Sequence, residues 1–195
     1  MKMTNLLITL SLLTAWACGN ASVETVPSAE AVGQQDNEKT LAIVKPGIET
    51  LRDGGFAELK GKRVGLITNP TGIDNSMVST IDILAKAPEV KLVALFAPEH
   101  GVRGDHVAGE TVKNSVDPAT GVPVYSLHGR TRKPTPEMLR DIDVLVYDIQ
   151  DIGCRSYTFI STMGLAMKAA SENGKEFMVL DRPNPLGGYK VEGNI

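Results

Sequence analysis

Five short apolar runs recur along the chain, at residues 64–68, 91–96, 122–125, 144–147 and 177–180. Each run is rich in aliphatic and aromatic side chains and is nearly continuous in apolar character, which is typical of strands covered on both faces. The segments between the runs show helical spacing instead, and they predict helices near 47–53, 76–86, 135–141 and 157–172. We expect these elements to form one domain over residues 41–195.

Side-chain types also predict where the helices begin and end. Ser76 or Asp74 is expected to begin the second helix and Gly174 to end the last one. The last helix should bury a single stripe, formed by Phe159, Ile160, Met163, Met167 and Ala170. Strands that alternate with helices pair in parallel through right-handed crossovers. The pattern therefore predicts an α/β fold with an open, mostly parallel Rossmann-like sheet flanked by helices.

The first 40 residues differ in composition from the rest. Lys2, the apolar run at 6–13 and the small residues before Cys18 resemble a bacterial lipoprotein signal, which predicts a signal peptide at 1–17 and a lipid on Cys18. An ordinary secretory signal, cut near Ala17 or Ala21, is the alternative. Residues 18–40 hold few large apolar side chains, so we expect a disordered tether. The chain is thus expected to be exported and membrane-anchored, facing the periplasm or the cell exterior.

Charge and cysteine content narrow the functional classes. The 20 Lys and Arg are balanced by 23 Asp and Glu, so the chain lacks the basic surface that binds nucleic acid. Beyond Cys18 only Cys154 remains, so no intramolecular disulfide is expected, and Cys154 is expected to fill a small buried position. The nucleotide-binding glycine motifs and the Gly-x-Ser-x-Gly elbow are missing from the sequence, so we expect no nucleotide cofactor and no α/β-hydrolase nucleophile.

Polar residues follow every predicted strand. Ligands of open α/β sheets bind beyond the carboxyl ends of the strands, so these segments should share one functional rim. The candidate residues, in chain order, are Asn69, Glu99, His100, Arg103, His128, Arg130, Asp148, Gln150, Asp151 and Asp181.

Two chemistries are compatible with these residues. In the first, Glu99 is a general acid or base beside His100, and Asp148, Asp151 or Asp181 is a second acid. In the second, a metal is bound by His100, His106, Glu110, His128 and an aspartate. The first is favoured, because the adjacent Glu99 and His100 rarely point to one ion and the sequence has no H-E-x-x-H helix. We therefore expect no metal.

Six separated segments resemble the YbbC/NamZ-type exo-β-N-acetylmuramidase family. They are VGLITNPTGID, LVALFAPEHGVRGD, AGE at 108–110, TGVPVYSLHGRTRKPTPEML, DIDVLVYDIQDIGCRSYTFISTM and VLDRPNPLGG. The resemblance covers residues 41–195. It implies a Rossmann-like N-terminal domain, normally followed by a second domain with the active site between them, so the chain is expected to hold only the first domain. It also implies that Glu99 is the catalytic glutamate and His100 its neighbour.

The resemblance further implies that the substrate is a peptidoglycan-derived sugar or muropeptide, from whose non-reducing end N-acetylmuramic acid is released. Glu99 would protonate the leaving oxygen, while a carboxylate, a water or the substrate's acetamido oxygen meets the developing cation. The lactyl carboxylate calls for a guanidinium, and the candidates are Arg103, Arg130, Arg132 and Arg155. Candidates for the sugar itself are Asn69, Asp148, Gln150 and Asp181. The alternative function is an anchored sugar- or muropeptide-binding module without turnover.

Overall fold

A computed structural model describes residues 44–105 and 114–193. All of them belong to the compact unit Ala42–Ile195. The predicted signal peptide at 1–17, the lipidation site Cys18 and the tether at 18–40 lie outside the described residues. No helix in the described part of the chain is long and apolar enough to cross a bilayer.

The core of the unit is a six-stranded sheet with the order β3-β4-β2-β1-β5-β6. The strands are β1 (Arg63–Thr68), β2 (Lys91–Ala97), β3 (Ser115–Val116), β4 (Pro123–Ser126), β5 (Val144–Asp148) and β6 (Glu176–Val179). All neighbouring pairs are parallel except β3 and β4, which run antiparallel. This confirms the predicted open, mostly parallel α/β sheet. The short edge strand β3 was not predicted. Its two residues are exposed, so they form no apolar run in the sequence.

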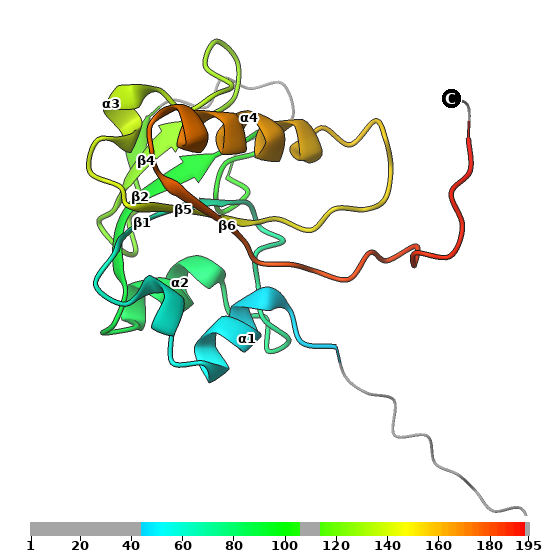
Figure 1. The fold of residues 1–195 in the computed structure, drawn as a ribbon, viewed down its shortest axis with the longest axis horizontal. Helices are drawn as coiled ribbons and strands as arrows, with labels where there is room; N and C mark the ends of the chain where they lie inside the picture. Colours follow the sequence, from blue (N-terminus) through cyan, green and yellow to red (C-terminus); the bar gives the residue numbers. More distant parts are fainter. Residues whose placement is uncertain (1–43, 106–113, 194–195) are drawn as a thin grey trace, which may run out of the picture. The chain divides into compact units, whose positions relative to one another are not determined.

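Helices cover both faces of the sheet (Figure 1). On one face lie α1 (Gly47–Asp53) and α2 (Thr80–Lys86), and on the other lie α3 (Pro136–Leu139) and α4 (Phe159–Glu172). A single 3-10 turn, η1 (Ala57–Leu59), follows α1. This placement explains why the strands have little polar alternation, since neither face of the central strands meets water.

Alternate residues of each central strand enter different cores. Val64 and Leu66 of β1 are fully buried in the cluster that contains Ile48 of α1 and Ile81 of α2. Ile67 points the other way, into the cluster that contains Phe159 at the start of α4. Because strand side chains alternate between faces, one run of apolar residues supplies both cores.

The two predicted helix ends have different outcomes. The second helix begins at Thr80, and Ser79 caps it by accepting a hydrogen bond from Ile81 N, so the prediction of Ser76 or Asp74 is wrong. The Asp74 carboxylate instead accepts from backbone N–H groups of its own loop. Gly174 closes α4 as expected, since its φ of 61° and the bond from Lys175 N to Ala170 O form a Schellman motif.

The predicted buried stripe of α4 is partly wrong. Ile160 and Met167 are 51% and 47% exposed, whereas Ala166 and Ala169 are fully buried against the sheet. Small side chains fill the contact face because they let the helix approach the strands closely. The buried position predicted for Cys154 is also wrong: Cys154 is exposed in the loop before α4, where its Sγ lies 3.1 Å from Ser156 Oγ.

Candidate active site

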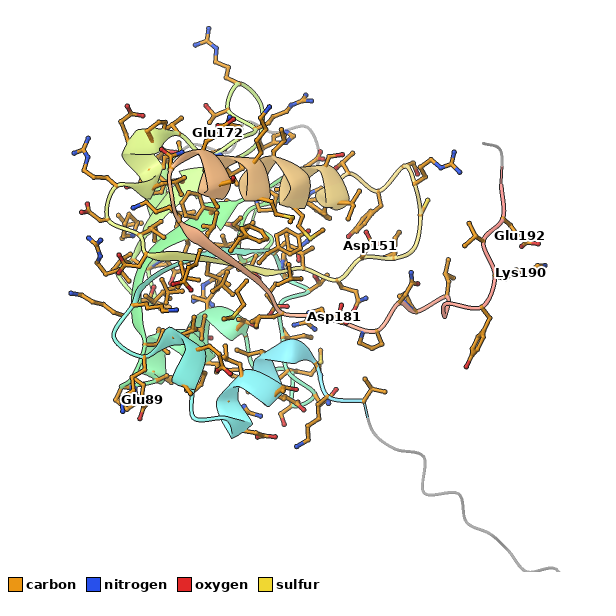
Figure 2. The ribbon with its side chains drawn as sticks, viewed as in Figure 1. Glu89, Asp151, Glu172, Asp181, Lys190 and Glu192 are labelled. Carbon is orange, nitrogen blue, oxygen red and sulfur yellow. The ribbon has the colours of Figure 1, made fainter. Side chains whose placement is uncertain are left out.

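The loops that follow the parallel strands lie at one end of the sheet, as expected for an open α/β fold. Figure 2 shows Asp151 and Asp181 at the end toward which β5 and β6 run, while Glu89 and Glu172 lie at the opposite end. The loop after β2 belongs to the same end, because β2 is parallel to β1 and β1 to β5. This loop carries Glu99 and His100.

A tight turn presents Glu99 and His100. Gly101 N donates to Pro98 O at 3.2 Å, and His100 adopts a φ of 72°. A positive φ at the third position is the mark of a type II turn, where glycine is normally found. A histidine in this conformation is uncommon and is typical of sites where the surroundings hold a strained backbone. The turn leaves the side chains of Glu99 and His100 half-buried.

Two adjoining cavities meet at Glu99. One has a volume of about 430 Å³ and is lined by Asn69, Pro70, Thr71, Glu99, His100, Ser156, Tyr157, Thr158 and Phe159. The other has a volume of about 240 Å³ and is lined by Glu99, Leu127, His128, Arg132, Thr158, Phe159, Ser161, Thr162 and Leu165. Together they have the size and the mixture of apolar and polar groups that small-ligand sites require. A larger cavity of about 530 Å³ lies beside α1 and β6 and contains neither Glu99 nor His100.

Glu99 stands outside the ion pairs that bind several other carboxylates of the described residues. Within the described residues its carboxylate makes no hydrogen bond or ion pair, whereas Asp74, Asp117 and Asp148 each bind an arginine. Glu99 is also the only carboxylate among the described residues that line the two cavities. A half-buried carboxylate that the fold does not use is available to donate or accept a proton at a ligand.

Asp148 is a structural residue, which corrects its prediction as a sugar ligand. It is completely buried, and Arg182 donates to both of its carboxylate oxygens, at 2.6 and 3.0 Å. Thr80 Oγ1 adds a third hydrogen bond. Arg182 also donates to Ile73 O, so this ion pair joins the end of β5 to the loops that follow β1 and β6. A ligand has no access to it.

Arg103, a predicted guanidinium for the lactyl carboxylate, is likewise bound by internal partners. Its guanidinium donates two hydrogen bonds to Asp117 and one to Asp82, so the protein itself supplies its counter-ions. The hydrogen bonds from Arg103 hold the pKa of the Asp117 carboxyl below its ordinary value. Asp117 is almost fully buried and the Arg103 side chain is 29% exposed, so Arg103 braces the loop after β2 with its guanidinium bound by internal partners.

The remaining arginine candidates differ in whether they line a cavity that contains Glu99. Arg130 and Arg155 are exposed, and neither lines a cavity with Glu99. Arg132 does line one, together with His128. Arg132 is therefore the guanidinium that the fold places with Glu99.

The other predicted sugar ligands are divided between two places. Asn69 lines the larger cavity with Glu99. Gln150 does not line it, because its Nε2 donates to Asp151 O and Pro183 O. Asp181 lines a separate cavity of about 190 Å³ together with Asp151. The second acid expected from Asp148, Asp151 or Asp181 is thus absent from the two cavities at Glu99.

Sequence reasoning missed the residues at the start of α4. Ser156, Tyr157, Thr158 and Thr162 line the cavities, although no strand directly precedes them. The Tyr157 ring packs edge-on against Phe159, with ring centroids 4.8 Å apart, and burial raises the pKa of its hydroxyl. The only available signal was the polar run Ser156 to Thr158 just before an apolar helix.

No group of three metal-binding side chains occurs among residues 44–105 and 114–193. His106 and Glu110, which belong to the metal alternative, lie outside the described residues, as does the AGE segment at 108–110. His100 and His128 line different cavities, which meet at Glu99.

An α/β domain with a half-buried glutamate at two cavities beyond its strand ends has the arrangement that is typical of small-ligand sites in open α/β folds. The chain matches the family described as "Exo-beta-N-acetylmuramidase NamZ, N-terminal" over residues 64–195, and it belongs to that family. This confirms the resemblance carried by the sequence motifs.

Individual relatives agree with this assignment. The chain is 53% identical over 182 residues to the peptidoglycan beta-N-acetylmuramidase NamZ of Bacillus subtilis, covering 93% of this chain and 44% of that protein. A solved DUF1343 family protein from Bacteroides fragilis is 70% identical, with a TM-score of 0.72, over 77% of this chain and 38% of that one. A second one from the same organism is 33% identical, with a TM-score of 0.57, over 72% and 35%. The chain therefore spans less than half the length of these relatives.

Proposed function

We propose that this chain is the catalytic N-terminal domain of a glycosidase that releases N-acetylmuramic acid from the non-reducing end of peptidoglycan fragments. Glu99 is the general acid that protonates the leaving oxygen and the general base of any later step. The observation that carries the proposal is the position of Glu99, unpaired and half-buried where two cavities meet. A glycosidic bond has a sugar on each side, so its cleaving acid belongs at such a junction.

The surroundings of Glu99 support a sugar that carries a carboxylate. Arg132 and His128 line the smaller cavity and can bind an anion, while Asn69 and Tyr157 give the larger cavity an amide and an aromatic ring. A planar guanidinium pairs well with the lactyl carboxylate that distinguishes N-acetylmuramic acid from N-acetylglucosamine. The chain thus has the groups to discriminate between the two sugars.

Release of 4-nitrophenol from the β-N-acetylmuramide and from the matching β-N-acetylglucosaminide tests the proposal. The assay uses the chain without residues 1–17, alone and joined to any residues that its gene encodes after Ile195. We expect release from the muramide only. Muramide binding without release, by both proteins, would replace the enzyme with the alternative, an anchored binding module.

Comparing two leaving groups, a sugar and 4-nitrophenol, tests the role of Glu99 more sharply. If Glu99 protonates the leaving oxygen, Glu99→Gln should lose about 100-fold to 10,000-fold on a sugar leaving group, which needs the proton. Measured as kcat/KM, which excludes any later step in which Glu99 acts as a base, the loss should be far smaller on 4-nitrophenol, which leaves as an anion. Glu89→Gln, at the opposite end of the sheet, is the matched control and should retain full activity (Figure 2). Equal losses on both substrates would remove Glu99 from the acid role.

We also propose that the chain is exported and anchored to the membrane through a lipid on Cys18, facing the periplasm or the cell exterior. The support is the signal-like pattern of residues 1–17, with an apolar run at 6–13 and alanines at 15 and 17 before Cys18. Labelled palmitate added to expressing cells should be incorporated into the protein and lost in Cys18→Ser. Export with no label in the wild-type protein would favour the ordinary secretory signal.

A further inference from the structure

We infer that Asn69 presents a polarised hydrogen-bond donor to the cavity beside Glu99, that Thr71 fixes it in this orientation, and that it binds the acetamido carbonyl oxygen of the sugar. The inference rests on the proposed function and assigns a specificity-determining residue and a positioning residue to the same site.

The orientation of the Asn69 amide follows from its partners. Thr71 N donates to Asn69 Oδ1 at 2.9 Å, and a backbone N–H has only a donor to offer. The atom that it meets must therefore be the amide oxygen, so the Nδ2 group occupies the other side of the amide plane. Thr71 Oγ1 also donates to Oδ1, at 2.5 Å.

Asn69 Nδ2 is left without a partner in the described part of the chain, although Asn69 as a whole is only 6% exposed. Asn69 lines the cavity of about 430 Å³ that also contains Glu99. No fully buried side-chain nitrogen of the described residues lacks a partner, so Nδ2 itself keeps access to solvent, and water or a ligand can accept from it. We place that acceptor in the cavity, which Asn69 lines.

A chain of hydrogen bonds strengthens this donor. Gln150 N donates to Thr71 Oγ1 at 2.9 Å, which leaves the single hydroxyl proton of Thr71 free to point at Asn69 Oδ1. Successive bonds of this kind polarise one another, and an amide whose oxygen accepts two bonds is a better donor at its nitrogen. The loop after β5 thereby orients a group on the loop after β1.

The chemistry of the donor selects the ligand group. Nδ2 offers donors only and carries no charge, so it fits a neutral acceptor such as an amide carbonyl better than a hydroxyl, which needs to donate as well. A carboxylate is better bound by Arg132, in the adjoining cavity. The acetamido oxygen is the neutral carbonyl that N-acetylmuramic acid carries on the sugar ring.

The test compares two ligands on the same protein by calorimetric titration: N-acetylmuramic acid, and glucose bearing the same lactyl ether at O3, which has a hydroxyl in place of the acetamido group. Thr71→Val removes the hydroxyl and should weaken binding of the first about threefold to tenfold. Binding of the second should change less than about twofold. Thr71→Ser restores the hydroxyl and should restore the preference.

Asn69→Asp is the second variant. It keeps the oxygen that Thr71 binds but replaces the donor by an acceptor, so it should abolish the preference for the acetamido ligand without unfolding the protein. Thermal unfolding of all variants checks the fold. Equal weakening of both ligands, or an unchanged preference, would overturn the inference while leaving the proposed function standing. Failure of the wild-type chain to bind either ligand would instead reject the proposed function, and the inference with it.

Discussion

Removing Arg182 should destabilise this domain severely, because it leaves a buried charge without its partner. Asp148 is completely buried and the Arg182 side chain is 7% exposed. Breaking such a pair from one side costs about 3–5 kcal/mol, most of it from the unpaired charge. Arg182→Met retains the apolar stem, so the predicted loss reports the ion pair and not a cavity.

The double variant separates this reasoning from a simple loss of contacts. Asp148→Leu with Arg182→Met replaces both charges by apolar groups, and such replacements are often close to neutral. We therefore expect each single variant to lose about 3–5 kcal/mol and the double variant to lose clearly less than the sum. The double variant should still lose some stability, because Thr80 Oγ1 no longer has the Asp148 carboxylate as a hydrogen-bond acceptor.

Urea unfolding followed by circular dichroism measures these free energies, provided that the slope with urea is unchanged among the variants. Arg63→Met is the matched control: Arg63 and Asp143 also form a paired fork, but their side chains are 36% and 40% exposed. Its loss should be far smaller, since water screens and replaces an exposed pair. An Arg182→Met loss no greater than that of Arg63→Met, or strictly additive losses in the double variant, would refute the reasoning.

Three further predictions concern the frame that supports the site. Gly47→Ala places a Cβ 2.7 Å from the Leu180 backbone and should cost about 1–3 kcal/mol in urea unfolding. Ser79→Ala removes the cap of α2 and should cost about 1 kcal/mol in the same assay. Arg103 depresses the pKa of Asp117, so this pair stabilises the fold above the unfolded pKa of about 4 and the benefit is lost as the pH falls below it. Unfolding stability should consequently decrease more steeply with acid in the wild type than in Arg103→Met.

Much of the fold could be predicted because each central strand is buried on both faces. Continuous apolar runs placed β1, β2, β4, β5 and β6 to within a few residues, and their alternation with helices gave the parallel pairing. The antiparallel edge strand β3 could not be predicted, because Ser115 and Val116 are exposed and offer no apolar run, and the strand is defined by its pairing with β4. The buried face of α4 was assigned only in part: Phe159 and Ala170 are buried as expected, but Ala166 and Ala169 are buried in place of the expected Ile160 and Met167.

The site could be predicted less well, since sequence position does not reveal which charges pair. Asp148 and Arg103 stand at strand ends as a ligand-binding residue would, yet each is neutralised by a partner distant in the chain, Arg182 and Asp117 respectively. Glu99 and Asn69 stand at equivalent positions and line one cavity, and within the described residues the Glu99 carboxylate and Asn69 Nδ2 have no partner. The distinction depends on contacts over 14 to 34 residues of sequence, which only the folded structure supplies.

The strained backbone of His100 allows its two roles to be separated. His100→Gly and His100→Ala both remove the imidazole, but only alanine retains a Cβ at a φ of 72°. The glycine variant should therefore be more stable than the alanine variant by about 1 kcal/mol, whatever the imidazole itself contacts. If the imidazole takes part in turnover or substrate binding, both variants lose activity equally. If His100 serves only to shape the turn that presents Glu99, both variants keep activity near that of the wild type. Equal stability of the two variants would contradict the left-handed turn itself.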